Sequence, residues 1–290
     1  MEVQVFAVGA KAYEALCVVT LQKEKGIKGY FSRRAIIYGG PIIATTATEE
    51  QVKDLLTEIQ KFYKSRAIYI EIRNFFDYSV YKNLFLANNF RFVPWLNFQL
   101  PVQSPEQINA AISKSRVRQI KKALKQGVTW QVAEKEEDVL QFYNILSDLY
   151  RSKIKKPLFE KEFFLHFFRA NMGKYLLVYF NNRVIGGIMC PILPQKAIYE
   201  FYVCGLDQEF KDQYPSIMAT WAAIEYALQN NIPLFDFMGA GSPDEAYGVR
   251  EFKARFGGEL VEHGRYIKVL NPFLYQVGKL GLSILSKIKK

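Results

Sequence analysis

The stretch that decides the fold is LFDFMGAGSPDEAYGVREFKARFGG, residues 234–258. It begins with a short apolar run, residues 234–238, which is typical of a buried strand. Asp236 is the only charge in that run, and a buried carboxylate destabilises a fold by several kcal/mol unless it is paired. The glycines Gly239 and Gly241 follow at once, so the strand is expected to end in a loop that needs unusual backbone angles.

A helix is expected after this glycine loop. Residues 242–245, SPDE, carry a helix-start signal, but Gly248 interrupts the turn, so the main helix is expected to restart near Val249. Lys253 lies at the edge of an apolar stripe and is half drawn into it. The stripe and the glycine stop that ends the helix comprise Val249, Phe252, Phe256, Gly257 and Gly258.

The order and spacing of these features resemble a known family. DFMGAG followed by GVREFKARFGG resembles the closing signature of the Fem family, the peptidoglycan-bridge aminoacyltransferases, and equally that of FemAB-like GNAT acyltransferases. The resemblance is strongest over residues 107–266. It implies an enzyme that forms an amide bond from an activated acyl donor, either aminoacyl-tRNA or an acyl thioester such as acyl-CoA, with no permanently bound cofactor.

The rest of the chain predicts two α/β units. Residues 14–100 read as β-β-α-β-α-β, and residues 127–270 have the strand and helix order of a GNAT domain, with three antiparallel strands at their centre. The expected fold class is therefore α/β (α+β, mixed sheet), with tandem GNAT-like domains of which the first is abbreviated. The expected parts are residues 1–104, residues 105–270 and a C-terminal helix at residues 271–290.

Composition narrows the class of protein. The 290 residues are 50% hydrophobic and carry a formal net charge of +11. This balance predicts a folded chain with a polyanionic partner, such as nucleic acid, an anionic membrane or a phosphorylated substrate, although basic proteins without such partners are common. Cys17, Cys190 and Cys204 lie in apolar runs without metal-ligand spacing, which indicates reduced thiols in a cytosolic protein. No metal site, signal peptide or membrane-spanning segment is expected.

The helix expected at residues 110–125 carries six basic residues and no acid. One side is apolar, and the other bears a basic stripe at i, i+4, i+7 and i+11, which repels itself unless phosphates or acids neutralise it. The stripe is expected to cradle phosphates of tRNA, of a lipid-linked precursor or of coenzyme A; a solvated helix face is the alternative. The apolar residues are Ile108, Ile112, Val117, Ile120 and Leu124, and the stripe residues are Lys114, Arg118, Lys121 and Lys125.

The segment QYPSIM, residues 213–218, departs from the GNAT pattern. Ordinary GNAT enzymes hold the pyrophosphate of acyl-CoA with a glycine-rich turn at a helix N-terminus, because backbone amides must approach the phosphates closely. Pro215 has no amide to donate, and both expected glycines are missing. This segment argues against acyl-CoA bound in that manner and leaves the donor open.

Amide formation needs a base for the amine proton and a cation or amide at the developing oxyanion. The resemblance places a phenylalanine–lysine pair beside the reacting ester, so Lys253 is expected in the electrophilic role, with Phe252 next to it. Glu200, among the aromatic residues of AIYEFYV, is the expected base, because desolvation favours the protonated form of a carboxylate. A structural partner of an arginine is the alternative.

Other site residues follow from the same resemblance. Arg151 and Tyr202 resemble residues with which Fem proteins hold a phosphorylated acceptor. Asp236 is expected to order the loop that contains Gly239 and Gly241, next to the substrate.

The last twenty residues contain four lysines and no acid, with apolar residues on one side. This pattern is typical of a basic amphipathic helix that lies in a lipid headgroup layer, although a helix docked on the first domain has the same pattern.

The sequence thus predicts a Fem-like aminoacyltransferase or acyltransferase for cell-envelope precursors, cytoplasmic and peripheral at the inner face of the membrane. Its partners would be tRNA or acyl-CoA and a phosphorylated or lipid-linked amine. Alternatives are a CoA-dependent GNAT enzyme acting on a polysaccharide or lipid amine, and a non-catalytic module that binds nucleic acid or membrane.

Overall fold

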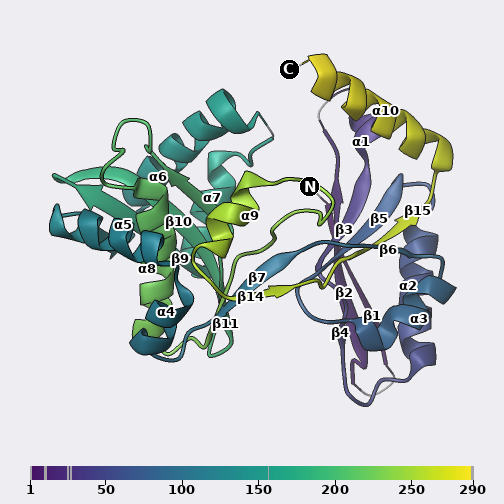
Figure 1. Cartoon of the computed structure of the whole chain (residues 1–290). Coiled ribbons are helices and arrows are strands. Elements are labelled where there is room, and N and C mark those ends of the chain that lie inside the picture. The colour runs from purple at the N-terminus through teal and green to yellow at the C-terminus, as the bar shows by residue number, and fades with distance from the viewer. Residues whose placement is uncertain (1, 10–11, 25, 27, 156, 289–290) are drawn as a thin grey trace. The chain divides into compact units, whose positions relative to one another are not determined.

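The computed structural model describes residues 2–9, 12–24, 26, 28–155 and 157–288 (Figure 1). The chain divides into two compact units. Unit 1 comprises Met1–Trp95 together with Glu262–Lys290, and unit 2 comprises Leu96–Val261. The chain therefore leaves unit 1, forms the whole of unit 2, and then returns to complete unit 1.

Unit 1 is built on a mixed seven-stranded sheet in the order β1-β2-β3-β5-β15-β6, with β4 beside β2. Only the β3–β5 pair is parallel among the pairings of this sheet in the described residues. The strands are β1 (Glu2–Val8), β2 (Ala15–Gln22), β3 (Arg34–Gly39), β4 (Ile42–Ile43), β5 (Tyr69–Asn74), β6 (Arg91–Val93) and β15 (Arg265–Val269). The helices are α1 (Lys28–Ser32), α2 (Glu49–Tyr63), the 3-10 turn η1 (Ser79–Tyr81), α3 (Lys82–Ala87) and α10 (Pro272–Ile288).

Helix α2 anchors the core of unit 1. Thr48 and Gln51 form the capping box that the sequence predicts, and each side chain bonds the backbone amide of the other. The buried face packs on the sheet and includes Val52, Leu55, Leu56, Ile59 and Tyr63. Each of these aliphatic side chains stabilises the fold by about 1.5–3 kcal/mol through burial. Strand β1, which the sequence did not indicate, adds an edge to this sheet.

Unit 2 has an eight-stranded sheet in the order β14-β7-β13-β11-β10-β9-β8, with β12 beside β10. Its strands are β7 (Asn97–Pro101), β8 (Thr129–Val132), β9 (Gly173–Phe180), β10 (Arg183–Leu193), β11 (Ala197–Tyr199), β12 (Tyr202–Gly205), β13 (Leu234–Asp236) and β14 (Glu259–Val261). Its helices are α4 (Pro105–Ala111), α5 (Lys114–Lys125), α6 (Glu136–Leu149), the π-helical turn η2 (Tyr150–Ile154), α7 (Lys161–Arg169), α8 (Pro215–Gln229) and α9 (Gly248–Ala254).

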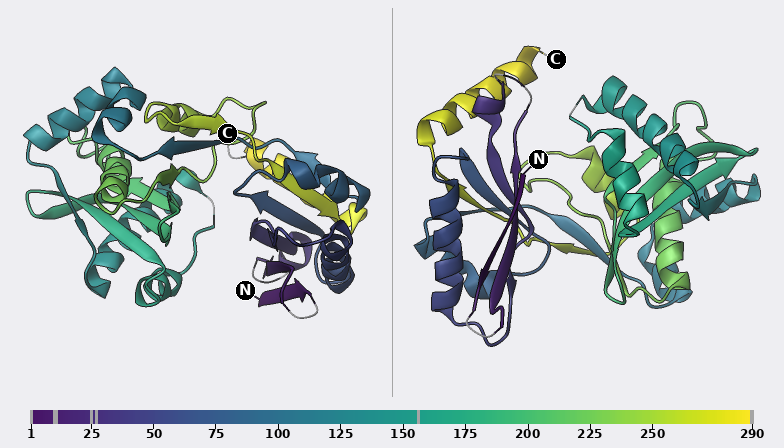
Figure 2. Two further views of the ribbon diagram at one scale, coloured as in Figure 1. Left: turned by 90° about the horizontal axis from the view of Figure 1, so that it is seen from below. Right: turned by 180° about the vertical axis from the view of Figure 1, so that it is seen from behind.

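Two helix layers cover the sheet of unit 2 (Figures 1 and 2). Along β9, Leu176 and Val178 pack with α8 and α5, while the alternate residues Tyr175 and Leu177 pack with α6 and α7. Because successive side chains of a strand point to opposite faces, the two sets of helices lie on opposite sides. The central antiparallel strands are therefore buried on both faces, which explains why they read as continuous apolar runs.

Two long strands expected from the sequence are each divided between the units. Residues 90–100 form β6 of unit 1 and β7 of unit 2, and Pro94 lies at the break, where it cannot donate to a ladder. Residues 259–270 form β14 of unit 2 and β15 of unit 1, separated by a turn in which Gly264 has φ +66°. The expected domain limits at residues 104 and 270 therefore differ from the unit limits by one strand each.

Local differences from the sequence expectation have clear causes. The helix expected at residues 110–125 is broken, because Ile112 is extended and Ser113 caps a new helix by accepting the Arg116 amide. Leu124 is 45% exposed and so leaves the apolar side of α5. The helix-start signal at residues 242–245 forms only a turn, and the helix begins at Gly248.

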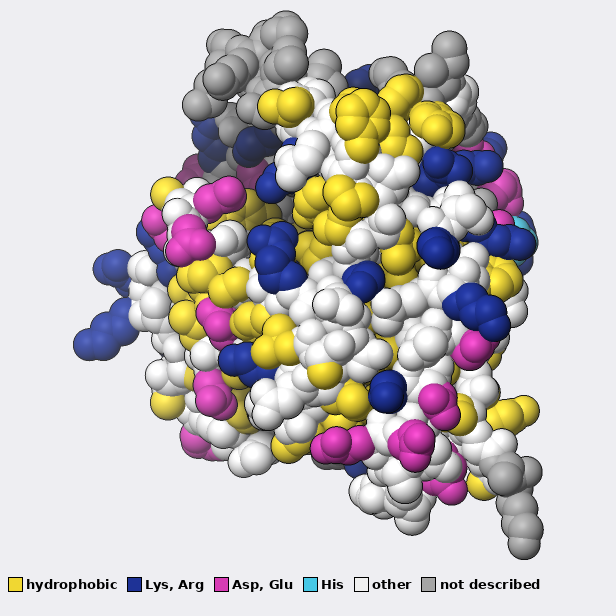
Figure 3. All heavy atoms as spheres, turned by 90° about the vertical axis from the view of Figure 1, so that its right-hand side faces the viewer, with side chains coloured by type: hydrophobic (Ala, Val, Ile, Leu, Met, Phe, Trp, Pro, Cys, Tyr) yellow, Lys and Arg dark blue, Asp and Glu magenta, His cyan; other side chains and the backbone are white. Residues whose placement is uncertain are grey.

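The first half of α10 packs on unit 1. Leu274 is buried, and Tyr275 meets Tyr69 edge to face at 5.4 Å. Phe273 and Leu280 are exposed, and Figure 3 shows apolar side chains gathered in its upper part, where α10 lies. The apolar residues expected further along, Ile284, Leu285 and Ile288, lie outside the residues whose side chains are described. No helix in the described chain is both long and apolar enough to cross a membrane.

Candidate active site

Strands β11 and β13 of unit 2 are paired over two residues and then diverge, which splits the sheet. These strands pair in parallel through Ile198–Phe235 and Tyr199–Asp236, and the last bond runs from the Glu200 amide to the Asp236 carbonyl at 2.9 Å. Beyond this point β12 pairs with β10, while the chain after β13 turns away at Met238, which has φ +55°. The split therefore opens at Glu200, and the carbonyls of Phe237 and Gly239 border it.

Lys253 reaches from α9 into this split. Its Nζ donates to the carbonyl oxygens of Phe237 at 2.5 Å and Gly239 at 3.0 Å, and it lies 3.0 Å from Oε1 of Glu200. The side chains of Lys253 and Glu200 are only 9% and 3% exposed. An ammonium group has three donors, so each of them has an acceptor here. The sequence indicates these two residues separately, and the fold joins them as a buried ion pair.

Glu200 also contacts the helix behind the sheet. Its Oε2 accepts a hydrogen bond from Oγ1 of Thr220 in α8 at 3.2 Å. Both carboxylate oxygens therefore have donors, as a buried charge requires. Thr220 carries no signal in the sequence, because a single threonine in an apolar helix reads as ordinary core.

Asp236 fixes the start of the loop that contains Gly239 and Gly241. Its carboxylate accepts from Nδ2 of Asn97 at 2.8 Å, from Nε2 of Gln99 at 2.9 Å and from the Met238 amide at 2.7 Å. Oδ1 of Asn97 in turn accepts from the Gly239 amide at 2.7 Å. Asn97 and Gln99 come from β7 and were not identified from the sequence, although their alternation along NFQ places both on one face of the strand.

The positive φ angles of the loop explain its glycines. Gly239 and Gly241 have φ values of +122° and +82°, in the region that side-chain-bearing residues rarely adopt. A Cβ on Gly241 would also lie 2.9 Å from the ring of Tyr247. Arg250 fixes the far side of the loop, where its guanidinium donates to the carbonyls of Ala240 and Ser242.

Arg116 fastens α9 to the basic helix α5. It is 3% exposed and lies over the rings of Phe252 and Phe256, at 4.7 and 4.6 Å from their centroids. It also donates to the Phe252 carbonyl at 3.1 Å. Burial, together with nearby Arg255, lowers the pKa of Arg116 to about 10. The spacing of the sequence indicates this burial, because residue 116 falls midway between Ile112 and Ile120 on the apolar side. Because Arg116 is charged, however, sequence analysis groups it with the basic residues of the helix.

Tyr202 lies in an aromatic cluster of unit 2, and Arg151 lies on the surface, next in sequence to Tyr150 of that cluster. The ring centroids of Tyr202 and Tyr150 lie 6.0 Å apart. Burial raises the pKa of Tyr150, and the charge of Tyr247 raises it further. Arg151 follows Tyr150 in the π-helical turn, is 82% exposed, and pairs with Asp148 at 2.7 Å. Tyr247, which touches Gly241, thus links this cluster to the glycine loop.

The N-terminus of α8 is already occupied by an acid. The Ser216 amide donates to Oδ1 of Asp207 at 3.0 Å, and the Ser216 hydroxyl bonds the other oxygen at 2.5 Å. Pro215 is the first residue of α8, and Tyr214 before it is left-handed. A carboxylate therefore stands where the pyrophosphate of acyl-CoA would lie in an ordinary GNAT domain.

The basic stripe of α5 is exposed. Lys114, Arg118, Lys121 and Lys125 all face solvent, whereas Lys122 pairs with Asp212 at 2.7 Å. The stripe is thus on the surface of the helix whose opposite side is joined to α9 through Arg116.

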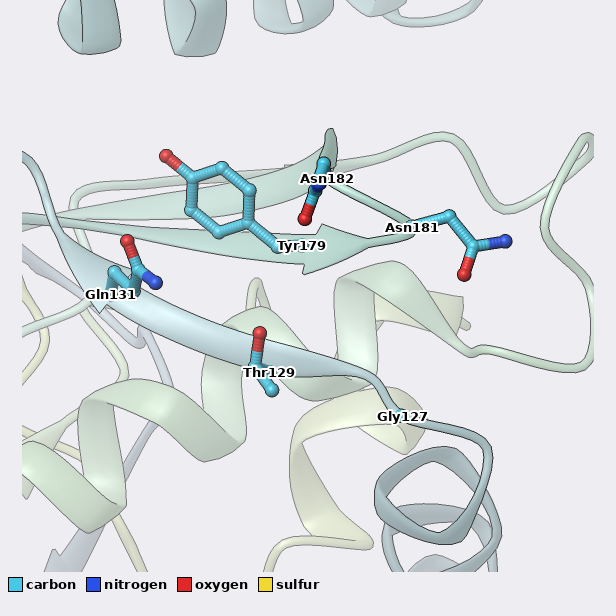
Figure 4. Close-up of a pocket in the computed structure, with 6 residues that line it drawn as sticks. All are labelled: Gly127, Thr129, Gln131, Tyr179, Asn181 and Asn182. Atoms are coloured by element: carbon cyan, nitrogen blue, oxygen red, sulfur yellow. The ribbon is translucent and has the colours of Figure 1, made fainter.

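A polar pocket of about 320 Å³ lies near the edge of the sheet formed by β8, next to β9 (Figure 4). Its lining comprises Gly127, Thr129, Gln131, Tyr179, Asn181 and Asn182. In the strand order β10 lies between the strands of this pocket and β11, and the pocket contains no predicted site residue.

Comparison with known proteins bears on the fold. Residues 180–280 match the model of the FemAB family. The structure of FemX is similar over 95% of this chain and 90% of its own, with a TM-score of 0.72 and 14% identity. The C-terminal domain of a candidate lysylphosphatidylglycerol synthetase from Agrobacterium fabrum is similar over 98% and 88%, with a TM-score of 0.65 and 11% identity.

A tandem GNAT protein from the clavulanic acid biosynthesis pathway is similar over 93% of this chain and 84% of its own, with a TM-score of 0.56 and 7% identity. Curated protein sequences include no match to this chain. The expected FemAB resemblance and the mixed α/β, tandem GNAT-like fold class are confirmed. The chain has a FemAB-like fold, as the sequence predicted.

Proposed function

We propose that this chain, whose fold is FemAB-like, is an aminoacyltransferase or acyltransferase that forms an amide bond on an amine of a cell-envelope precursor. The observation that carries this proposal is the buried Lys253–Glu200 pair in the split of the sheet, within the segment that matches the FemAB family. A buried ion pair is a weak source of stability compared with apolar packing, so its position beside the left-handed Met238 of the glycine loop favours a functional role.

The reaction joins the amine nitrogen to the acyl carbon and breaks the ester or thioester bond. The amine loses a proton and the leaving oxygen or sulfur gains one, so no other co-reactant is required. We assign Lys253 the electrophilic role: its bond to Gly239, at 3.0 Å, is longer than that to Phe237 and can be exchanged for the developing oxyanion. Glu200 keeps the ammonium in place and is the group that can accept the amine proton.

Arg151 and Tyr202 are the proposed acceptor-binding residues. Arg151 is exposed and can exchange Asp148 for a phosphate, which a guanidinium binds through two parallel hydrogen bonds. Tyr202, Tyr150 and Tyr247 would position the rest of the acceptor beside the glycine loop. A lipid-linked peptidoglycan precursor and a phospholipid amine both present this combination of amine and phosphate, whereas a polysaccharide amine supplies only the amine.

Aminoacyl-tRNA is the proposed donor. Asp207 occupies the α8 amide that would meet the pyrophosphate of acyl-CoA, and a carboxylate repels a phosphate. The exposed stripe of α5 offers four cations at a spacing that follows one side of the helix. We therefore propose that this stripe binds the tRNA backbone.

Replacing Lys114, Arg118, Lys121 and Lys125 together with glutamine should weaken tRNA binding at low salt. Each phosphate contact contributes about 0.7–0.9 to the slope of log K against log salt, so the slope should become shallower by about 3. Filter binding between 50 and 200 mM salt, roughly the range over which such contacts are resolved, measures it. Lys122→Gln is the control, because Lys122 is already paired. Equal slopes for the parent and the fourfold variant would contradict the tRNA assignment and favour another donor.

The C-terminal helix supports a peripheral place at the inner, anionic face of the membrane, in a cytoplasmic protein. Lys279 and the exposed Phe273 and Leu280 precede a lysine-rich end without acids. A chain ended at Gly281 keeps the docked half of α10 and loses three lysines. It should bind phosphatidylglycerol vesicles at least about tenfold more weakly in a flotation assay, with no difference on neutral vesicles. Identical retention of both chains on anionic vesicles would retire the membrane proposal.

A further inference from the structure

A second charged cluster lies in unit 1, whereas the residues assigned above to acyl transfer belong to unit 2. Glu71 is on the central strand β5 and is 4% exposed. Arg73 donates to both of its oxygens, at 3.1 and 3.2 Å, and Arg265 of the neighbouring strand β15 donates to Oε1 at 2.7 Å. Two guanidinium groups therefore converge on one buried carboxylate.

A third guanidinium completes the cluster. Arg34 on β3 pairs in register with Tyr69, and it helps to lower the pKa of Glu71 together with Arg73 and Arg265, against the opposing effect of burial. The register places Tyr69, Glu71, Arg73, Arg34 and Arg265 on the same face of the sheet, across strands that lie side by side in Figure 1. Arg73 and Arg265 bond Glu71, and Arg34 lies near it and is hydrogen-bonded to the side chain of Tyr69. These three cations and one carboxylate have a formal charge of +2.

This excess of charge is unfavourable in the protein alone. Arg265 and Arg73 are directly opposite on neighbouring antiparallel strands, an arrangement that destabilises a sheet when the charges are alike. Burial lowers the pKa of Arg265 to about 10 in spite of Glu71. One arginine would be enough to neutralise Glu71, so a purely structural ion pair accounts neither for the second bonded arginine nor for the nearby Arg34.

The guanidinium groups are held in fixed planes by aromatic rings. Arg265 lies 3.6 Å from the ring centroid of Trp95, and Arg73 lies 5.2 Å from that of Tyr38. A guanidinium has five N–H donors, and Arg73 and Arg265 direct only part of theirs at Glu71. Their side chains are 27% and 21% exposed, so a ligand can reach the remaining donors.

We propose that Arg34, Arg73 and Arg265 form a binding site for an oxyanion, a phosphate or diphosphate group, on the sheet of unit 1. The fork of a guanidinium matches the geometry of phosphate oxygens, and stacking on a ring reduces the entropy lost on binding. The bound anion neutralises the positive charge of the arginines that Glu71 alone does not neutralise. The residues of this site belong to unit 1, and it uses neither Lys253 nor the stripe of α5, which belong to unit 2.

Isothermal titration with inorganic pyrophosphate at constant ionic strength tests the site. The protein should carry the fourfold glutamine change in α5 together with Arg151→Gln, so that the phosphate-binding residues proposed in unit 2 do not respond. Arg34→Gln leaves the bonds from Arg73 and Arg265 to Glu71 intact, and it should weaken pyrophosphate binding about tenfold or more. Arg34→Lys keeps the charge but loses the forked guanidinium, so its affinity for pyrophosphate should lie between those of the parent and Arg34→Gln.

Arg66→Gln is the matched control, because Arg66 is a surface arginine of unit 1 that pairs with Glu2. It should bind pyrophosphate like the parent. The proposal is overturned if the parent does not bind pyrophosphate, or if Arg34→Gln and Arg66→Gln bind it equally while both melt at the parental temperature. Because the titration needs no acyl donor, its outcome is independent of the proposed transfer reaction.

Discussion

Lys253→Met should lower the free energy of unfolding by about 3–5 kcal/mol, because it leaves Glu200 as an unpaired charge in the interior. It also removes the donor from the Phe237 and Gly239 carbonyls at the split of the sheet. Adding Glu200→Gln to this variant should restore most of the loss, since a neutral amide no longer needs a cation. Urea unfolding of the parent, both single variants and the double variant measures the coupling between the two residues.

Lys122→Met serves as the control for this cycle, because Lys122 pairs with Asp212 on the surface, where such pairs contribute about 0–1 kcal/mol. If the double variant is as unstable as the sum of the two single variants, the two side chains do not interact, and the description of the split is wrong.

Gly257→Ala should destabilise the chain by about 2–4 kcal/mol. Gly257 has φ +82°, and a Cβ there would lie 2.4 Å from the backbone oxygen of Ala111. Both the backbone angle and the contact with the end of α4 oppose any side chain, and the strain is transmitted to α9, which bears Lys253. Thermal unfolding followed by circular dichroism measures the effect.

Gly248→Ala is the matched comparison in the same helix. A methyl group at position 248 would meet no described atom within 4 Å, and Gly248 begins α9 without a positive φ. The substitution should be neutral or stabilising by about 0.4–1 kcal/mol, because alanine restricts the unfolded chain. Equal destabilisation at positions 248 and 257 would show that the close approach to Ala111 is not what requires glycine.

Local signals in the sequence are sufficient for most elements. The capping box at Thr48, the strand that contains Asp236 and the restart of a helix near Val249 depend on neighbouring residues, and the structure has all three. The division of two strands between the units was not predicted, because apolar residues resume after Pro94 and after Gly264 and their pattern does not reveal that a strand changes sheets.

The candidate site could be predicted only as separate residues. Lys253 and Glu200 are far apart along the chain, and their pairing depends on the split between β11 and β13, which no local pattern encodes. Asn97, Gln99 and Thr220 complete the site from two further elements, and polar residues in a strand or an apolar helix carry no distinctive spacing. Arg116 is the exception, because its place on the apolar side of α5 could have marked it as buried.

The central claim is that the Lys253–Glu200 pair serves acyl transfer as well as the fold. The double variant Lys253→Met/Glu200→Gln separates these roles, because it should fold while lacking both groups. The decisive measurement is transfer of radiolabelled aminoacyl groups from charged tRNA to an envelope-precursor fraction. The parent should transfer label and the folded double variant should not; transfer at the parental rate by the double variant would contradict the account.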